Sequence, residues 1–358
     1  MRGDERPGER HDEANDASKA SKPRSVLVTH ADEPLGRRLV KRLFHDPDVE
    51  NILAVGDGPP PRSFDRYLGS SGGMITYKRV DLTKHRPAAD LFHSGSVRKA
   101  EVDTVIYVPR HAPAGDDRPI VAGVAERTAE ARLVLQHCLE VASIRGLVAI
   151  GSAFVYRLQP GNANRMTETS DLDLDPDVPS EIRSWIDCDM IFHGEVHNDR
   201  LRVALLRVPT VVTSGGYVFL NPSLASGGGP RVRPIGFDPM CALVSDKDVA
   251  RAAVLALHAR CAGIFNIAGS EALPLSVLAR WTGRPTLPLP GRVIEGVSRL
   301  AQLAGIGGLE SALDGDHLHY GFTLDTCRAE QQLGYRPSYR IGLSRAGDGS
   351  QRIETAPA

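Results

Sequence analysis

The sequence has few cysteines, no long apolar run and no large net charge. Its five cysteines in 358 residues are odd in number, widely spaced and without a C-x-x-C pair, which argues against a disulfide framework and is typical of a reducing compartment. No apolar stretch approaches the ~20 residues that a membrane helix needs. A formal net charge of -1 argues against general attraction to nucleic acid or to an anionic membrane. We therefore predict a cytoplasmic protein that binds neither nucleic acid nor membrane.

The two ends of the chain differ in composition from the middle. Residues 1–24 mix Arg, Asp and Glu without an apolar segment, which predicts a disordered tail rather than a signal peptide or an anchor. Small and charged residues return near the C-terminus, so 341–358 is predicted to be a second disordered tail. The intervening 25–340 are long enough to form one domain with a large core.

The segment 25–43 predicts a buried strand, a tight turn and an amphipathic helix. Val26, Leu27 and Val28 form a short apolar run suited to a parallel strand, and the next apolar residues recur at helical spacing, at Leu35, Leu39, Val40 and Leu43. Together they make the first half of a βαβ unit. In dinucleotide-binding folds this turn carries three glycines, because glycine lets the backbone approach the pyrophosphate. Here only Gly36 remains.

The same segment resembles a known family opening. Val28-Thr-His-Ala-Asp-Glu-Pro-Leu-Gly36 is similar to the V-T-G-x-x-G-x-x-G opening of the extended short-chain dehydrogenase/reductases, the NAD-dependent epimerase/dehydratase family. On this resemblance the family's first two glycines fall on His30 and Glu33, and the third falls on Gly36. Side chains at the first two positions occupy room that the phosphates need, and the Glu33 carboxylate repels them. The resemblance therefore implies NAD as the cofactor, while these residues weaken its binding.

Further segments resemble the family in the same order along the chain. They are 51–57, 74–82, 102–108, 146–156, 201–209, 242–252, 263–269 and 323–337. Their shared order implies an α/β fold, a Rossmann-like doubly wound parallel sheet within 25–340. A smaller C-terminal substrate lobe is built mainly from segments after 212.

The resemblance also implies which residues would bind the cofactor. Asp57 ends the second predicted strand, where the family's acid binds the adenosine ribose; the other interpretation is a turn residue before Gly58. Asp81 and Leu82 correspond to the pair that lies by the adenine in relatives, although Asp81 could equally cap the next helix. His30, Gly36 and Tyr107 complete the predicted crevice at the carboxyl ends of the strands.

The family's catalytic pair is missing. Ser152 takes the position of the catalytic serine, which would hydrogen-bond the reacting oxygen of the substrate; a strand-end serine bonded to its own backbone is the alternative. Active relatives also use Y-x-x-x-K on one helix face, but no such pair occurs from 152 to 207. The two positions fall on Asp187 and Ile191. An unconventional acid/base would have to be Tyr156, Asp187 or His193.

A metal site is not predicted. His193 and His197 stand one helical turn apart and could share an ion, but third and fourth ligands are lacking. A polar helix face is the favoured interpretation.

Three functional hypotheses remain. In the first, the chain is a divergent epimerase/dehydratase-like protein that has lost ordinary catalysis and acts as a binding or regulatory protein. In the second, it is an active NAD-dependent oxidoreductase or epimerase on a nucleotide-sugar-like substrate. In the third, it forms a homodimer, or a heterodimer with an active relative, through helices near 124–142 and 182–198, which the resemblance implies as the interface.

Overall fold

A seven-stranded parallel sheet organises the computed structural model, which describes residues 25–65, 74–93, 95–110, 120–163, 165–213, 216–219, 231–281, 286–304, 315–345 and 351–358. The strand order is β12-β7-β5-β4-β1-β2-β3, and every neighbouring pair is parallel. The strands are β1 (Ser25–Val28), β2 (Asn51–Gly56), β3 (Ile75–Arg79), β4 (Thr104–Tyr107), β5 (Gly146–Ser152), β7 (Arg202–Val208) and β12 (Gly263–Asn266). The predicted Rossmann-like α/β fold is confirmed.

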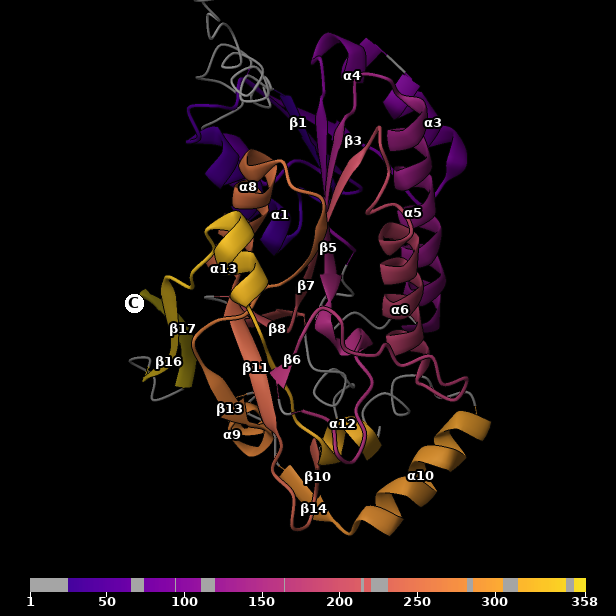
Figure 1. The fold of residues 1–358 in the computed structure, drawn as a ribbon, viewed down its shortest axis with the longest axis vertical. Coiled ribbons are helices and arrows are strands. Elements are labelled where there is room, and N and C mark those ends of the chain that lie inside the picture. The colour runs from indigo at the N-terminus through magenta and orange to yellow at the C-terminus, as the bar shows by residue number, and fades with distance from the viewer. Residues whose placement is uncertain are drawn as a thin grey trace, which may run out of the picture.

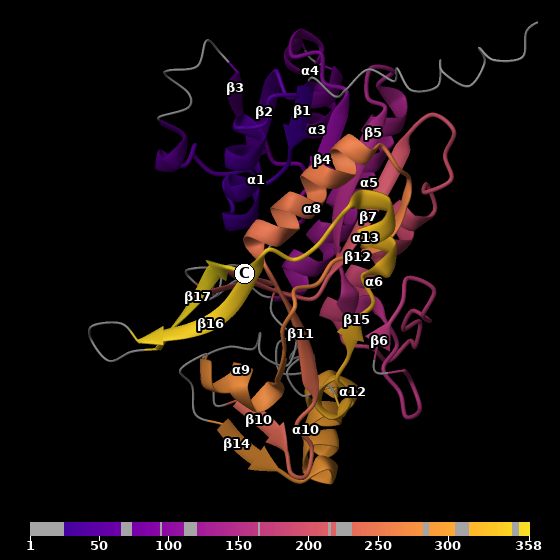
Figure 2. The ribbon, with the colours of Figure 1, turned by 60° about the vertical axis from the view of Figure 1, so that its left-hand side comes forward.

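Helices cover both faces of this sheet (Figures 1 and 2). One face carries α1 (Pro34–Phe44), α8 (Asp246–Ala259) and α13 (Cys327–Leu333). The other carries α3 (His85–His93), α4 (Gly95–Lys99), α5 (Ile120–Glu140) and α6 (Ser180–His193). None of the helices in the described ranges is long and apolar enough to span a membrane.

Alternation along the strands divides the core into two layers. In β1, Val26 and Val28 pack with α1 and α8, whereas Leu27 packs with α3 and α5. This follows because successive side chains of a strand point to opposite faces. The apolar run 26–28 therefore serves both layers, as expected for a parallel sheet covered on each side.

The predicted helix after β1 begins and ends as its sequence directs. Pro34 occupies the first turn, where its missing N–H costs nothing, and Lys41 and Arg42 lie in the last turn. Leu35, Leu39, Val40 and Leu43 are all buried. The helix N-terminus lies at the carboxyl edge of β1, as a dinucleotide-binding turn requires.

A smaller lobe lies below the sheet in Figure 1. Its four-stranded sheet has the order β13-β11-β8-β9, and a separate apolar cluster packs on it. Its elements are β8 (Thr210–Thr213), β9 (Gly216–Phe219), β10 (Arg231–Pro234), β11 (Met240–Ser245), β13 (Ala272–Pro274), α9 (Leu275–Trp281), β14 (Thr286–Leu289), α10 (Gly291–Leu303) and α12 (Gly315–His319). Short pieces lie between the two parts: η2 (Ala153–Val155), β6 (Arg165–Met166) and β15 (Thr323–Leu324). Another short piece, η1 (Arg62–Phe64), lies between β2 and β3 and buries Phe64 in the core of the main sheet.

The C-terminal segment differs from the predicted tail at 341–358. It forms an antiparallel hairpin, β16 (Tyr339–Arg345) with β17 (Gln351–Pro357). Ile341 is buried in the small-lobe cluster, and Lys247 donates to the Thr355 carbonyl at 3.2 Å. Tertiary contacts therefore order a segment whose composition alone suggested a tail. The predicted N-terminal tail, 1–24, lies outside the described residues.

Candidate functional site

The turn after β1 keeps the shape of a glycine turn without its first glycine. His30 has φ of 43°, a left-handed conformation that costs a non-glycine residue ~1 kcal/mol or more. Gly36 lies against this turn, since a Cβ there would stand 2.1 Å from the His30 carbonyl oxygen. The position where the resemblance expects the first glycine thus has a left-handed backbone conformation, and a side chain projects from it.

That side chain forms a buried ion pair. The Nε2 atom of His30 lies 2.7 Å from Oε1 of Glu130 on α5, and the two side chains are 2% and 0% exposed. Burial by itself lowers the pKa of His30, but the Glu130 carboxylate overcomes this and raises that pKa to about 9. His30 is therefore an imidazolium at neutral pH, and its charge is matched within the protein.

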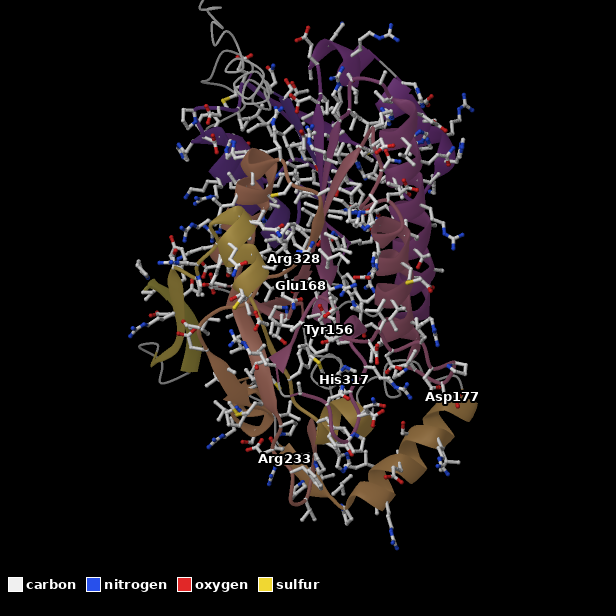
Figure 3. The ribbon with its side chains drawn as sticks, viewed as in Figure 1. Tyr156, Glu168, Asp177, Arg233, His317 and Arg328 are labelled. Atoms are coloured by element: carbon white, nitrogen blue, oxygen red, sulfur yellow. The ribbon has the colours of Figure 1, made fainter. Side chains whose placement is uncertain are left out.

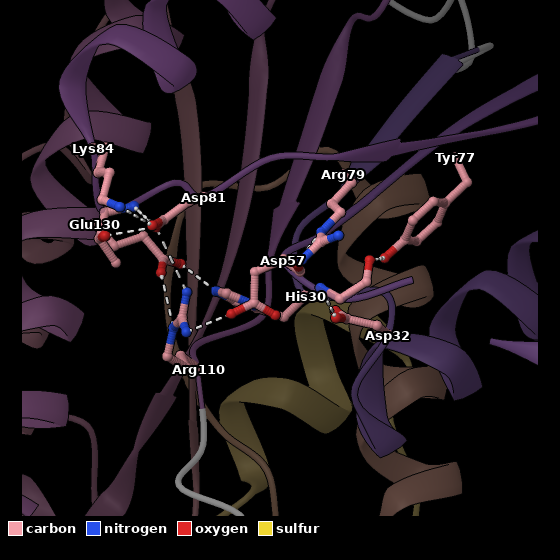
Figure 4. Close-up of polar contacts among 11 residues, drawn as sticks. His30, Asp32, Asp57, Tyr77, Arg79, Asp81, Lys84, Arg110 and Glu130 are labelled. Atoms are coloured by element: carbon pink, nitrogen blue, oxygen red, sulfur yellow. Dashed lines mark hydrogen bonds and ion pairs between the residues drawn. The ribbon is translucent and has the colours of Figure 1, made fainter. Parts of the chain in front are cut away.

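Arg110 extends the pair across the sheet edge (Figure 4). Its Nη1 atom lies 2.5 Å from Oδ2 of Asp57, its Nη2 atom 3.8 Å from Oδ1 of Asp81, and its Nε atom 4.0 Å from Oε2 of Glu130. Burial alone raises the pKa of Asp57, but Arg110 lowers it below the usual range. We call His30, Asp57, Asp81, Arg110 and Glu130 the crevice network. It joins the ends of β1, β2, β3 and β4 to α5.

Asp32 fills the space between this turn and β2. Its Oδ2 atom accepts from the Gly58 amide at 2.8 Å, and the Tyr77 hydroxyl donates to the Gly58 carbonyl at 2.8 Å. A Cβ on Gly56 would lie 2.3 Å from Oδ1 of Asp32 and 2.4 Å from the Tyr77 hydroxyl, so a larger residue there would have to displace these two side chains. Burial, and secondarily the Asp57 carboxylate, raise the pKa of Asp32. A fourth acid, beside Asp57, Asp81 and Glu130, thus occupies the crevice.

An open groove lies beside the network. It encloses about 830 Å³ and is lined by Asp57, Gly58, Lys78, Arg79, Val80, Asp81, Pro87, Asp90, Leu91 and Ser96. Arg79 donates through Nε to the Asp57 carbonyl at 2.8 Å, and Asp81 accepts from the Thr83 amide and hydroxyl. The volume falls in the range of small-molecule sites.

The structure separates the six predicted cofactor residues into three groups. Asp57 and Asp81 line the groove, and His30 and Gly36 form the turn. Leu82 and Tyr107 are buried in the core layer under α3 and α5. The Tyr107 ring lies 5.0 Å from that of Phe192, and its hydroxyl has no hydrogen-bond partner among the described residues.

The three predicted catalytic residues do not form a relay. The Ser152 hydroxyl accepts from the Phe154 amide at 3.1 Å and caps η2, which is the backbone role given as the alternative. Tyr156 donates to Asn266 at 2.7 Å. Asp187 is half-buried on α6, and within the described residues no hydrogen bond joins it to Ser152 or Tyr156.

A second buried network, which the sequence did not reveal, lies at the other end of the sheet. Asp189 accepts two bonds of 2.7 Å from Arg207 on β7, and Arg207 also donates to the Tyr156 hydroxyl at 3.1 Å. Asn266, the register partner of Arg207 on β12, accepts from Tyr156 through its side-chain oxygen, and its backbone N–H donates to Glu168 at 2.8 Å. We call Tyr156, Glu168, Asp189, Arg207 and Asn266 the strand-end network. Figure 3 labels Tyr156 and Glu168, between the sheet and the small lobe.

Tyr156 is held by this network in its protonated form. Burial raises the pKa of its hydroxyl, although Arg207 opposes the rise. The Tyr156 hydroxyl donates to Asn266 and accepts from the buried Arg207. With both bonds made inside the protein, it stabilises the fold and has no free proton to transfer to a substrate. The signal in the sequence was the charged Arg207 at the end of an apolar strand.

Comparisons with known proteins agree with the fold. No family model matches the chain. An uncharacterized protein of Mycobacterium tuberculosis H37Rv is 28% identical over 335 residues, covering 88% of this chain and 81% of that protein. Its counterpart in Mycobacterium bovis matches to the same extent.

Two solved structures are similar throughout. DesIV, a dTDP-glucose 4,6-dehydratase of Streptomyces venezuelae determined with NAD and TYD bound, is 18% identical with a TM-score of 0.61, covering 91% of this chain and 94% of that one. The UDP-glucose-4-epimerase of Stenotrophomonas maltophila, determined with NAD and formylated UDP-arabinopyranose, is 17% identical with a TM-score of 0.60, covering 88% and 93%. The chain therefore has the extended short-chain dehydrogenase/reductase fold of NAD-dependent epimerases and dehydratases.

Proposed function

We propose that this protein is a non-catalytic binding or regulatory protein, built on the epimerase/dehydratase fold, whose dinucleotide crevice is closed to the cofactor's diphosphate by its own ion pairs. The observation that carries the proposal is the buried His30–Glu130 pair at the turn where that diphosphate would lie. The imidazolium of His30 is already matched by a carboxylate, so it offers a phosphate no unpaired charge.

The surrounding charges support the same proposal. Arg110 is engaged by carboxylates from β2, β3 and α5, and Asp32 occupies the space beneath Gly56. A diphosphate would have to displace these acids or lie against them, and like charges at such distances repel strongly where water is excluded. Catalysis is weakened separately, because the Y-x-x-x-K pair is absent and Tyr156 is held within the strand-end network.

One observation favours the alternative, an active NAD-dependent oxidoreductase or epimerase on a nucleotide-sugar-like substrate. The open groove at Asp57 and Asp81 has room for a nucleoside beside a carboxylate that could accept from a ribose hydroxyl. In that case Ser152, Tyr156 and Asp187 are the proposed catalytic residues, and His30, Gly36, Asp57 and Asp81 the proposed cofactor contacts. The side chains of Leu82 and Tyr107 lie in the core behind them.

Calorimetric titration of the full chain with NAD, NADH, NADP and NADPH separates the two, once the purified protein has been checked for a retained dinucleotide. We expect no binding at millimolar cofactor. We also expect measurable binding to the variant His30→Gly/Glu33→Gly/Glu130→Gln, which restores both glycines and does not leave Glu130 as a carboxylate without its imidazolium. Tight binding by the native chain, abolished by Asp57→Ala, would overturn the proposal in favour of the enzyme.

Pairing through α5 and α6 stays a prediction. Met190 on α6 is a large apolar side chain and is 50% exposed, which is consistent with an interface on this helix. Sedimentation of the chain alone, and with an active epimerase or dehydratase, would detect a homodimer or heterodimer respectively.

A further inference from the structure

Three potential metal ligands converge where α3 packs against α5, about two helical turns along α5 from Glu130 of the crevice network. His93 lies at the end of α3, and His137 and Glu140 lie one turn apart near the end of α5. Figure 1 shows the two helices side by side on the outer face of the sheet. The ligand atoms come from positions 44 residues apart in the chain.

The spacing of the three atoms is that of a coordination sphere. Nε2 of His93 lies 3.2 Å from Nδ1 of His137 and 3.2 Å from Oε2 of Glu140, and the latter two atoms are also 3.2 Å apart. Tetrahedral zinc with bonds of ~2.0–2.1 Å places its ligand atoms ~3.3 Å from one another. The three atoms therefore match one face of such a tetrahedron.

Hydrogen bonds account poorly for this triangle. Each ring nitrogen has a single in-plane lone pair or a single proton, and an ionised carboxylate oxygen only accepts. One proton forms one good hydrogen bond, along one of the three atom–atom contacts. If both ring nitrogens donate to Glu140, the two N–H groups face each other across the third contact. A cation at the centre of the triangle satisfies all three atoms together.

The neighbouring side chains orient the ligands. Gln136 donates to Oε1 of Glu140 at 2.7 Å, which leaves Oε2 for the two nitrogens. The His137 ring stacks on Phe92, with centroids 5.2 Å apart and an angle of 22°. Its other nitrogen is buried without a hydrogen-bond partner among the described residues, so Nδ1 is the atom that this ring presents. Such outer contacts hold metal ligands in place.

The site is open on one side. His137 is 2% exposed, whereas His93 and Glu140 are 49% and 43% exposed, so an ion can enter from solvent. His85, an exposed residue one helix length before His93, has its ring 6.2 Å from that of His137. The His85 ring nitrogens are not part of the group of close ligand atoms, so the fourth position is available to water.

We propose that His93, His137 and Glu140 form a binding site for a divalent transition-metal ion, Zn²⁺ by the chemistry of two imidazoles and one carboxylate, which fastens α3 to α5. The site is independent of the proposed function. The pair His193 and His197, which the sequence singled out, belongs to α6 and to the turn that follows it; it serves as the matched control.

Zinc calorimetry on tag-free, chelator-treated full-length protein tests the site, with Co²⁺ absorption as the second readout. We expect one Zn²⁺ per chain, a higher melting temperature with zinc, and the intense visible bands of tetrahedral Co²⁺. His93→Gln/Glu140→Gln should lose binding by at least about a hundredfold and Gln136→Ala by about tenfold. His193→Gln/His197→Gln should bind as the native chain does.

The substituted residues of the first variant are half-exposed, so its fold should persist, and its circular dichroism without metal checks this. Absence of Zn²⁺ binding by the native chain would overturn the proposal. So would unchanged affinity in His93→Gln/Glu140→Gln, or equal loss in the His193→Gln/His197→Gln control.

Discussion

The crevice network and the strand-end network lie at opposite ends of the same sheet edge and differ in what surrounds them. The crevice network contains one buried pair, His30–Glu130 at 2.7 Å, and a half-exposed Asp57 that contacts Arg110 at 2.5 Å, and it borders an open groove. The strand-end network is sealed, because Arg207 and Asp189 are 1% and 0% exposed and joined by two bonds of 2.7 Å.

This difference indicates which of the two networks a ligand can reach. A sealed bidentate pair fixes the geometry of the strands around it but is inaccessible to a ligand. A network beside an open groove can still exchange one of its contacts for a ligand group. If the protein binds a small molecule at this edge, the end of β2 is the place that we expect.

The largest effect should come from breaking the sealed pair. Asp189→Ala leaves a buried guanidinium without its carboxylate, and we expect a loss of about 4 kcal/mol in the free energy of unfolding. Urea denaturation measures it. Replacing both partners, as Asp189→Leu/Arg207→Met, should recover most of the loss, since no charge is then stranded. A loss below ~1 kcal/mol in the single variant would show that the pair is not sealed.

Neutralising the tight pair of the crevice network should cost somewhat less. Glu130→Gln keeps an acceptor for His30 but removes the charge that stabilises the imidazolium, so we expect a loss of about 3 kcal/mol at pH 7. Glu295→Gln, at an exposed position on α10, is the control and should cost under ~0.5 kcal/mol. Equal losses of unfolding free energy in the two variants would show that the His30–Glu130 ion pair does not stabilise the fold.

The same pair should make stability depend on pH. The folded pKa of His30, about 9, lies above its ordinary value of 6.5. Its stabilisation is therefore fully present below pH 6.5 and is lost as the pH rises through 9. The free energy of unfolding of the native chain should be lower above pH 9 than below pH 6.5, by up to ~3 kcal/mol. The slope over this window should be much flatter in His30→Gln, and an unchanged slope would assign the dependence to another group.

The smallest effect should come from the edge of the groove. Tyr77→Phe removes the bond to the Gly58 carbonyl, and we expect a loss of about 1 kcal/mol. Tyr320→Phe is the matched control, since its half-buried hydroxyl donates no hydrogen bond among the described contacts. If the Tyr77 variant also gained affinity for nucleosides, the groove would be shown to open there.

The sheet and its helices could be predicted because they depend on local periodicity. The first βα unit is predicted by local pattern alone: an apolar run from Val26 to Val28, then apolar residues at helical spacing at Leu35, Leu39 and Leu43. The β16–β17 hairpin could not be predicted in this way. Its strands are stabilised by Ile341 packing on the small lobe, and the composition of the segment does not indicate this contact.

The candidate site was predicted only in part. His30, Asp57 and Asp81 do meet at one edge, as the carboxyl ends of parallel strands must. Their partners Glu130 and Arg110 were missed, because one lies within a helix and the other follows a strand, without any motif. Tyr107 was expected in the crevice, but alternation along β4 buries it against Phe192.

By itself the sequence determined the fold class, the degenerate glycine turn and the absence of a Y-x-x-x-K pair, because each is a matter of residue type and spacing along the chain. What replaced them depends on contacts between residues that are distant in the chain. His30 and Glu130 are 100 positions apart, and His93 and His137 are 44 apart. The charge of His30, like the ligand geometry of His93, depends on burial and distance, which arise only when the layers pack.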